Sequence, residues 1–287
     1  MLSRRSFLKK ALSFLFFWIA IPSGFYYYAR EIEPTLLTIH KHPIRSPKID
    51  ATFDQCKIVH FSDTHVGFQY SIPQLNDLVT QINAVNPDII CFTGDLVDNP
   101  YTFNKFEEVT KALRNLQATY GKYWVYGNHD HGGYGTEQMK ETMVAAQFTL
   151  LQNESISIHK GDAHIHIAGL DDAILGKPHI EDALQHIKDD AFVCLLAHEP
   201  DIVDTVKNHA VDMQLSGHSH GGQIRLPFIG PLITPRMARN YVDGSYQFDN
   251  HPMQLFVSRG IGTTRLPFRL FCRPEFNVYT LHHTNDE

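Results

Sequence analysis

The chain has 287 residues, of which 43% are hydrophobic and 20% charged, an ordinary balance for a globular protein with a sizeable core. Its net charge of -6 argues against general nucleic-acid binding, which requires a basic surface, so no nucleic-acid partner is expected. The four cysteines form no C-x-x-C pair, so a structural zinc ribbon is not predicted. Cys91 and Cys194 lie inside apolar runs, which favours buried, inert thiols.

Residues 1–30 have the form of an export signal or a membrane anchor. Residues 3–10, SRRSFLKK, resemble the twin-arginine signal closely, which implies the twin-arginine export machinery as a partner. The apolar residues 11–29 would span about 28 Å as a helix, enough to cross a bilayer core. The tyrosines at 26–28 would then lie at its outer interface. The alternative interpretation is that the basic residues are a chance patch and that the apolar stretch after them is a helix of the protein core.

The basic head keeps the N-terminus in the cytoplasm, so the remainder of the chain is expected outside the cytoplasmic membrane. We find no convincing small-x-small cleavage site near residues 20–25, which leaves retention as an anchor open. The expected location is therefore membrane-anchored, cell-wall or extracellular.

Beyond the anchor, residues 31–54 are predicted to form an extended arm that joins a sheet, and residues 55–287 a single domain. Short apolar runs alternate with amphipathic segments in the first half of this domain, which predicts an α/β protein. Strands are predicted at 56–61, 88–92 and 123–126, followed by helices at 72–85, 104–116 and 136–146. Further strands are predicted at 155–159, 164–168, 192–197, 211–215, 255–258 and 276–281.

Five of these strands end in small clusters of polar residues, most of them with glycine close by. The candidate metal ligands in these clusters are Asp63, His65, Asp95, Asn128, His198, His218 and His220. Each cluster alone is weak evidence, but their common placement is not, because α/β sheets build their sites at the carboxyl ends of strands. Mixed imidazole and carboxylate ligands suit Mn, Zn, Fe or Co better than Ca or Mg.

In chain order, the clusters resemble the motif blocks of the calcineurin-like metallophosphoesterases. The family's blocks are D-x-H, G-D, G-N-H-[D/E], a separate H and G-H-x-H. They are matched here by Asp63-x-His65, Gly94-Asp95, Gly127-Asn128-His129-Asp130, His198 and Gly217-His218-x-His220. Residues 128–135, 217–228 and 258–262 also resemble the YkuE-type branch, phosphodiesterases of bacilli that carry a twin-arginine signal. The resemblance covers nearly the whole chain.

The resemblance implies a four-layer α/β/β/α sandwich with two mixed β-sheets, and two divalent metal ions in the catalytic domain. One ion would take Asp63, His65, Asp95 and His220, and the other Asp95, Asn128, His198 and His218. Asp95 would bridge them, and a metal-bridging hydroxide would attack a phosphodiester substrate. His129 would be the catalytic residue that contacts the phosphate or protonates the leaving oxygen.

Charge supports a preference for phosphodiesters. Two divalent ions bring about +4, while Asp63, Asp95 and one hydroxide bring about -3, which leaves roughly +1 for an anionic substrate. Asn128 preserves this balance because it would ligate through a neutral oxygen.

The other histidines and the arginines have mostly structural interpretations. His164 and His166 alternate with apolar residues, which favours a solvated strand face, and His60 is predicted to pack within its strand. Arg225, Arg259 and Arg265 could meet a phosphate, but surface or ion-pair roles are favoured.

Two residues beside Asn128 are candidates for substrate contact. His131 could line the pocket. Asp130 could do so too, although support of the loop or orientation of a neighbouring histidine is the favoured role.

Two competing functions are left open. A pyrophosphohydrolase acting on a nucleotide-linked lipid such as UDP-diacylglucosamine would suit an anchor, but its site would have to face the cytoplasm. A metal-binding module without turnover is disfavoured, because His129 and every expected ligand are retained.

Overall fold

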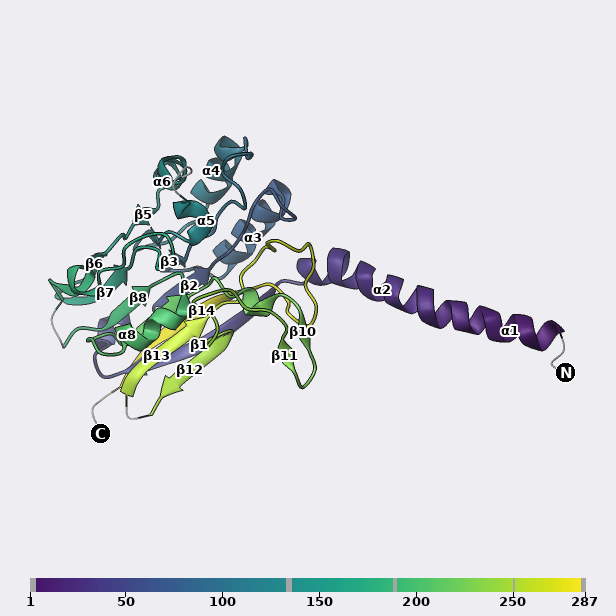
Figure 1. The fold of residues 1–287 in the computed structure, drawn as a ribbon. Helices are drawn as coiled ribbons and strands as arrows, with labels where there is room; N and C mark the ends of the chain where they lie inside the picture. Colours follow the sequence, from purple (N-terminus) through teal and green to yellow (C-terminus); the bar gives the residue numbers. More distant parts are fainter. Residues whose placement is uncertain (1–3, 133–135, 188–189, 250, 285–287) are drawn as a thin grey trace.

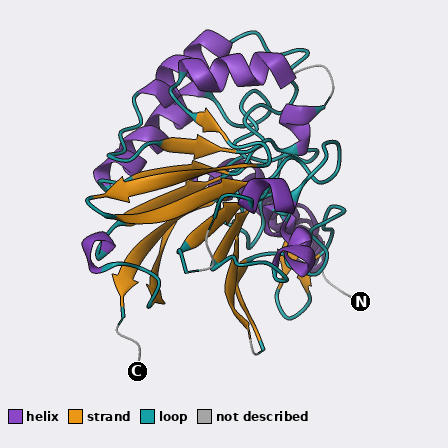
Figure 2. Ribbon diagram, turned by 90° about the vertical axis from the view of Figure 1, so that its left-hand side faces the viewer, coloured by secondary structure: helices purple, strands orange, loops and turns teal. Residues whose placement is uncertain are grey.

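The computed structural model describes residues 4–132, 136–187, 190–249 and 251–284, and two mixed six-stranded sheets form its centre (Figures 1 and 2). The first sheet has the order β1 (Thr38–Ser46), β14 (Glu275–His283), β2 (Lys57–Phe61), β3 (Ile89–Phe92), β4 (Lys122–Trp124), β5 (Thr149–Leu150). The second has the order β12 (Gly244–Phe248), β13 (His251–Val257), β9 (Met213–Ser216), β8 (Val193–Leu196), β7 (Ala163–Gly169), β6 (Glu154–Lys160). Antiparallel pairs are β14–β2, β12–β13 and β6–β7, and the other neighbours are parallel.

Successive side chains along a strand point to opposite faces of the sheet, so each sheet packs against a different layer on each face. In β3, Ile89 and Cys91 join the core between the sheets, while Ile90 and Phe92 join the core under the helices of the first sheet. Those helices are α3 (Ile72–Ala84), α4 (Phe106–Arg114) and α6 (Thr136–Ala145). The second sheet is covered by the shorter α7 (Ile180–Leu184) and α8 (Val203–Val206). The predicted four-layer sandwich with two mixed sheets is confirmed.

A long helix precedes this domain and projects from it (Figure 1). It includes α1 (Arg4–Leu15) and α2 (Ile21–Tyr27), runs without a break from Arg4 to Thr35, and is long and apolar enough to cross a membrane. The helix extends into the range expected for the arm, so the extended part is shorter than residues 31–54. The extended part of the arm contains strand β1, which pairs in parallel with β14 at the edge of the first sheet.

Some local predictions fail for identifiable reasons. His166 is buried rather than solvated, because the face that it shares with Ala168 packs on the α7 side of the sheet. Its Nδ1 lies 3.1 Å from the Ser157 hydroxyl. Strand β12 and the short hairpin of β10 (Arg225–Leu226) and β11 (Gly230–Pro231) have no counterpart among the predicted strands.

Other local predictions are confirmed. His60 is buried and its Nε2 lies 2.8 Å from the Thr93 hydroxyl, as expected for a histidine packed within its strand. Cys91 and Cys194 are buried free thiols.

Candidate metal centre

All seven candidate ligands follow strands whose carboxyl ends meet at one edge of the sandwich. Asp63 and His65 follow β2, Asp95 follows β3, Asn128 opens the short helix α5 (Asn128–His131) after β4, His198 follows β8, and His218 and His220 follow β9. Six of the seven are buried, and Asn128 is partly buried. Burial of so many ionisable groups in one place is costly unless they bind a ligand or one another.

The backbone is strained where these side chains converge. Five of the seven candidates have left-handed φ angles: Asp63 53°, His65 42°, Asp95 60°, His218 65° and His220 50°. Such residues cost free energy and persist where the surrounding structure imposes them, typically at functional sites. Gly217 is required for the same convergence, because a Cβ there would lie 2.3 Å from the Asp63 carboxylate.

The first group of side chains has the geometry of ligands around one ion. The Nε2 atoms of His65 and His220 lie 3.1 Å apart, and His220 Nε2 lies 3.5 Å from Asp63 Oδ1. Two imidazole nitrogens that each lie about 2.1 Å from a shared metal come about this close to one another. The Asp63, His65 and His220 side chains therefore fit a divalent transition metal.

The second group converges on the same aspartate. Asp95 Oδ2 lies 3.4 Å from His65 Nε2 and 3.3 Å from His198 Nε2, so one carboxylate oxygen faces both groups. Asp95, His198 and His218 also form a set whose ligand atoms lie within 4.8 Å of one another. Asn128 Oδ1 is buried without a hydrogen-bond partner, as expected of an atom that faces a metal.

Backbone carbonyls orient the imidazoles of the site. His198 Nδ1 lies 2.5 Å from the Thr93 carbonyl, and His218 Nε2 lies 2.8 Å from the Arg236 carbonyl. His65 Nδ1 lies 3.2 Å from Asp98 Oδ1. Such contacts fix the orientation of the ring and which nitrogen faces the metal. The sequence prediction missed Asp98, although its place three residues after Asp95 in the same loop could have suggested it.

The charges of the site are strongly coupled. Burial alone would raise the pKa of Asp95, but His198 and His129 outweigh it and hold that pKa well below its usual range. The same pairing with Asp95 overcomes burial and raises the pKa of His198. Burial and the neighbouring His198 lower the pKa of His218 to about 4, so this imidazole is neutral and suited to ligation.

His129 lies beside the candidate ligands with one ring nitrogen already occupied. Its Nδ1 lies 2.6 Å from the Asp98 carbonyl, and its backbone N–H donates to Asp95 Oδ1 at 2.9 Å. The ring meets that of His65 edge to face at 4.6 Å, and the side chain lines a pocket beside the candidate ligands. Burial opposes protonation, but Asp95 outweighs it and raises the pKa of His129.

The two candidates for substrate contact behave differently from His129. Asp130 is fully buried and accepts backbone N–H groups of Asp95, Leu96 and Gly127 at 2.6, 3.0 and 3.1 Å. It therefore joins two site loops, and the substrate-contact role considered for it is not supported because its oxygens face the backbone. His131 is partly buried with Nε2 3.5 Å from the Asp171 carboxylate, and its contact with substrate stays a prediction.

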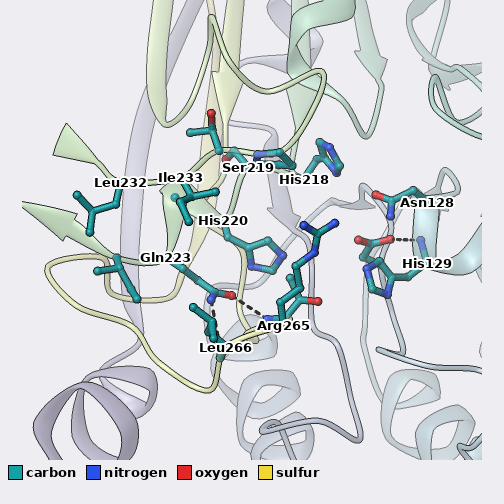
Figure 3. A pocket seen from close by; sticks show the side chains of 16 residues that line it. Asn128, His129, His218, Ser219, His220, Gln223, Leu232, Ile233, Arg265 and Leu266 are labelled. Carbon is teal, nitrogen blue, oxygen red and sulfur yellow. Dashed lines mark hydrogen bonds between the residues drawn. The ribbon is translucent and has the colours of Figure 1, made fainter. Parts of the chain in front are cut away.

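A pocket of about 400 Å³ opens onto the candidate ligands (Figure 3). Its polar end is formed by Asp95, Asn128, His129, His218 and His220, and its remaining walls include Gln223, Leu232, Ile233, Arg265 and Leu266. In Figure 3 the Arg265 side chain extends from the loop toward the imidazoles and the Asn128 amide.

The three arginines considered as phosphate contacts have different surroundings in the structure. Arg225 and Arg259 pair with Asp243 at 2.7 and 3.0 Å, which confirms the ion-pair role favoured for them. Arg265 is exposed, which agrees with the surface role favoured for it, and it also lines the pocket. A loop between β13 and β14 returns to the site and places Arg265 there, a path that local sequence does not reveal.

Buried Asp and His clusters at the strand ends of a four-layer sandwich define a metal-dependent phosphoesterase site. The calcineurin-like phosphoesterase family matches residues 56–222, more than half of the chain. The metallophosphoesterase YkuE of Bacillus subtilis (strain 168) is 44% identical over 286 residues, 99% of each chain. The phosphodiesterase YaeI of Escherichia coli (strain K12) is 29% identical over 290 residues, 98% of this chain and 100% of YaeI. A metallophosphoesterase of Helicobacter pylori (strain ATCC 700392 / 26695) is 31% identical over 281 residues, 95% of this chain and 71% of its own.

This protein therefore belongs to the calcineurin-like metallophosphoesterases and is a metal-dependent phosphoesterase. The membership of this family that the motif blocks predicted is confirmed. Residues 133–135 of the block that follows Asn128 lie outside the described residues, as does Ser3 of the twin-arginine motif.

Proposed function

We propose that the protein hydrolyses phosphodiesters at a dinuclear metal centre and acts outside the cytoplasmic membrane. The observation that carries the proposal is the position of Asp95, whose single oxygen Oδ2 lies 3.4 Å from His65 Nε2 and 3.3 Å from His198 Nε2. A carboxylate between two sets of ligands suits a pair of ions rather than one. Asp63, His65, Asp95 and His220 would hold one ion, and Asp95, Asn128, His198 and His218 the other.

When bound, the two ions would supply Lewis acidity and a hydroxide nucleophile near neutral pH. His129 would place a proton at the leaving oxygen through Nε2, because its Nδ1 is held by the Asp98 carbonyl and its side chain lines the pocket. Arg265 would contact a non-bridging phosphate oxygen from the opposite wall. Asn128 would ligate without adding a negative charge, which favours a substrate that carries a single negative charge.

The placement outside the membrane rests on the N-terminal segment. Arg4 and Arg5 stand at the head of an apolar helix, and a basic head stays in the cytoplasm while the chain beyond the helix crosses. Accessibility of the domain to protease in intact cells tests the orientation. Cleavage only after the membrane is permeabilised would contradict it.

A matched pair of substrates tests the reaction. Purified full-length protein in detergent is expected to hydrolyse bis-(p-nitrophenyl) phosphate with Mn or Zn, to prefer it over p-nitrophenyl phosphate, and to lose activity with a chelator. Faster turnover of the monoester would contradict the preference for diesters. Inactivity with Mn, Zn, Fe and Co alike would contradict the proposed reaction.

The alternative reaction, pyrophosphohydrolysis of a nucleotide-linked lipid, is distinguished from diester hydrolysis by its product. Release of UMP from UDP-diacylglucosamine at a higher kcat/KM than hydrolysis of the diester would favour the pyrophosphohydrolase instead.

A further inference from the structure

An apolar surface formed by two loop segments, residues 224–235 and 264–273, lies beside the pocket. We refer to it as the loop surface. Its large exposed apolar side chains are Phe228, Ile229, Leu232, Ile233, Leu266 and Phe271. The two segments are joined, because the backbone N–H of Arg225 donates to the Leu270 carbonyl at 2.9 Å and that of Leu270 to the Gln223 carbonyl at 2.9 Å. Contiguous apolar groups of this kind mark a contact with another molecule or with a membrane.

Two of these residues lie at the tip of the β10–β11 hairpin and are highly exposed. Phe228 is 109% exposed and Ile229 72% exposed, so their side chains contribute little to the core of the domain. Exposure of large apolar groups in water is unfavourable, at roughly 25 cal/mol per Å² of apolar surface.

The loop surface is also basic, although the chain as a whole carries a net charge of -6. Neither segment contains an Asp or a Glu, and the tetrapeptide Arg-Leu-Pro-Phe occurs in both, at residues 225–228 and 265–268. Arg265 and Arg273 are exposed within it, and Arg236 is exposed immediately after the first segment. A surface with apolar side chains among arginines is complementary to an anionic lipid surface.

The second segment is attached to the end of the N-terminal helix. The Tyr26 ring meets the Phe268 ring edge to face at 5.3 Å, and the Arg269 N–H donates to the Ala29 carbonyl at 2.8 Å. The buried Glu33 carboxylate accepts the Cys272 N–H. Figure 1 shows the β10–β11 hairpin at the edge of the domain from which the helix leaves. Tyrosines mark the interface level of membrane helices, so the loop surface lies at that level when the helix crosses a bilayer.

The same residues connect this surface to the catalytic pocket. Leu232, Ile233 and Leu266 are exposed members of the loop surface and also line the pocket, whose other end holds Asn128 and His129. Figure 3 shows the Leu232 and Ile233 side chains across the pocket from these two residues. An apolar wall therefore leads from the membrane level to the metal ligands.

We propose that the loop surface rests on the outer face of the bilayer that the helix crosses, and that the substrate is an amphiphilic phosphodiester resident in that bilayer. This inference rests on the proposed phosphodiesterase function. The substrate's phosphate lies at the metal ligands and its apolar chain lies along Leu232, Ile233 and Leu266. Hydrolysis breaks one P–O bond: the hydroxyl of water joins phosphorus and its proton goes to the departing alcohol, which leaves a phosphomonoester.

Inhibition by dialkyl phosphates tests the apolar wall in the full-length protein in detergent. Dimethyl, dibutyl and dihexyl phosphate share one anionic phosphodiester and differ only in apolar length. Inhibition of bis-(p-nitrophenyl) phosphate hydrolysis is expected to strengthen about fourfold for each methylene that the wall buries. The Ile233→Asn variant is expected to flatten this dependence on chain length.

Equal inhibition by all three phosphates, with hydrolysis intact, would overturn the inference alone. Absence of hydrolysis with every metal would instead refute the proposed function on which it rests.

A fluorescent label tests contact with the membrane. All four native cysteines are buried, so an environment-sensitive thiol label reports on a cysteine introduced at Phe228, with Val144→Cys on α6 as the matched exposed control. In phosphatidylglycerol–phosphatidylethanolamine vesicles, spin-labelled lipid is expected to quench the label at 228 at least threefold more than the label at 144.

Two outcomes would overturn the placement of the loop surface. One is equal quenching at positions 228 and 144. The other is shielding of position 228 that follows protein concentration in the absence of lipid, which would assign this surface to contact between copies of the chain.

Discussion

Arg269 is the side chain whose removal is expected to have the largest effect on stability and metal binding together. It is fully buried, and its guanidinium donates five hydrogen bonds to four backbone carbonyls. The acceptors are the carbonyls of Arg259, Gly260, Gly262 and Cys272, at 2.6 to 3.1 Å. These carbonyls belong to the segment that holds Asp63 in place.

The expected cost of Arg269→Met follows from those acceptors. Methionine fills much of the volume but donates nothing. The Gly260 carbonyl keeps the Glu275 N–H as a donor at 3.2 Å. The other three carbonyls lose their partners at roughly 1 kcal/mol each, or about 3 kcal/mol in total. For a domain of this size the melting temperature falls by about 2–4 °C per kcal/mol, which predicts a decrease of about 6–12 °C. Gly262 N–H donates to the Asp63 carbonyl at 2.8 Å, so disorder in the loop also weakens metal binding at Asp63.

Thermal unfolding and metal titration measure the two effects. Arg269→Lys keeps the charge but not the planar fork, so an intermediate melting temperature is expected. Arg45→Met, at an exposed position of β1, is the control and is expected to shift stability by less than about 0.5 kcal/mol. Activity of Arg269→Met is expected to need more Mn for half-saturation. A melting temperature equal to that of the Arg45 control would refute the role assigned to Arg269.

Three further variants probe the site and the core. Asn128→Asp is expected to retain metal but to raise KM for the diester about tenfold or more, because it adds a negative charge beside the phosphate; an unchanged KM would contradict the charge argument. His129→Gln is expected to lower kcat by about 10²–10⁴-fold, and less for p-nitrophenolate than for alkoxide leaving groups, which need the proton more; equal losses would remove its role as acid. Burial lowers the pKa of His60 to about 3, below its unfolded value near 6.5, so its contribution to stability is present above pH 6.5 and is lost as pH falls. Urea unfolding at pH 7 and 5 is therefore expected to show His60→Gln losing about 2 kcal/mol less than the wild type, and equal losses would exclude His60 as a source of the acid sensitivity.

Local sequence predicted the parts of the fold that repeat short, regular patterns. The apolar runs that became β2, β3, β4, β8 and β9 were placed correctly, and α3 and α4 were predicted within two residues of their observed ends. Strands β10 and β11 have two residues each, too short for any periodicity to show. The pairing of β1 with β14 joins residues more than 200 positions apart, which no local pattern encodes.

The sequence by itself determined which residue types could bind metals, because each candidate ligand directly follows an apolar run and parallel strands end at a common edge. Only the tertiary structure decided what surrounds them. It placed Asp98 beside His65, put Arg265 in the pocket, and buried Arg269 among four carbonyls. These roles depend on loops that return across the molecule, and the path of a loop is set by its packing and hydrogen bonds rather than by its own residues.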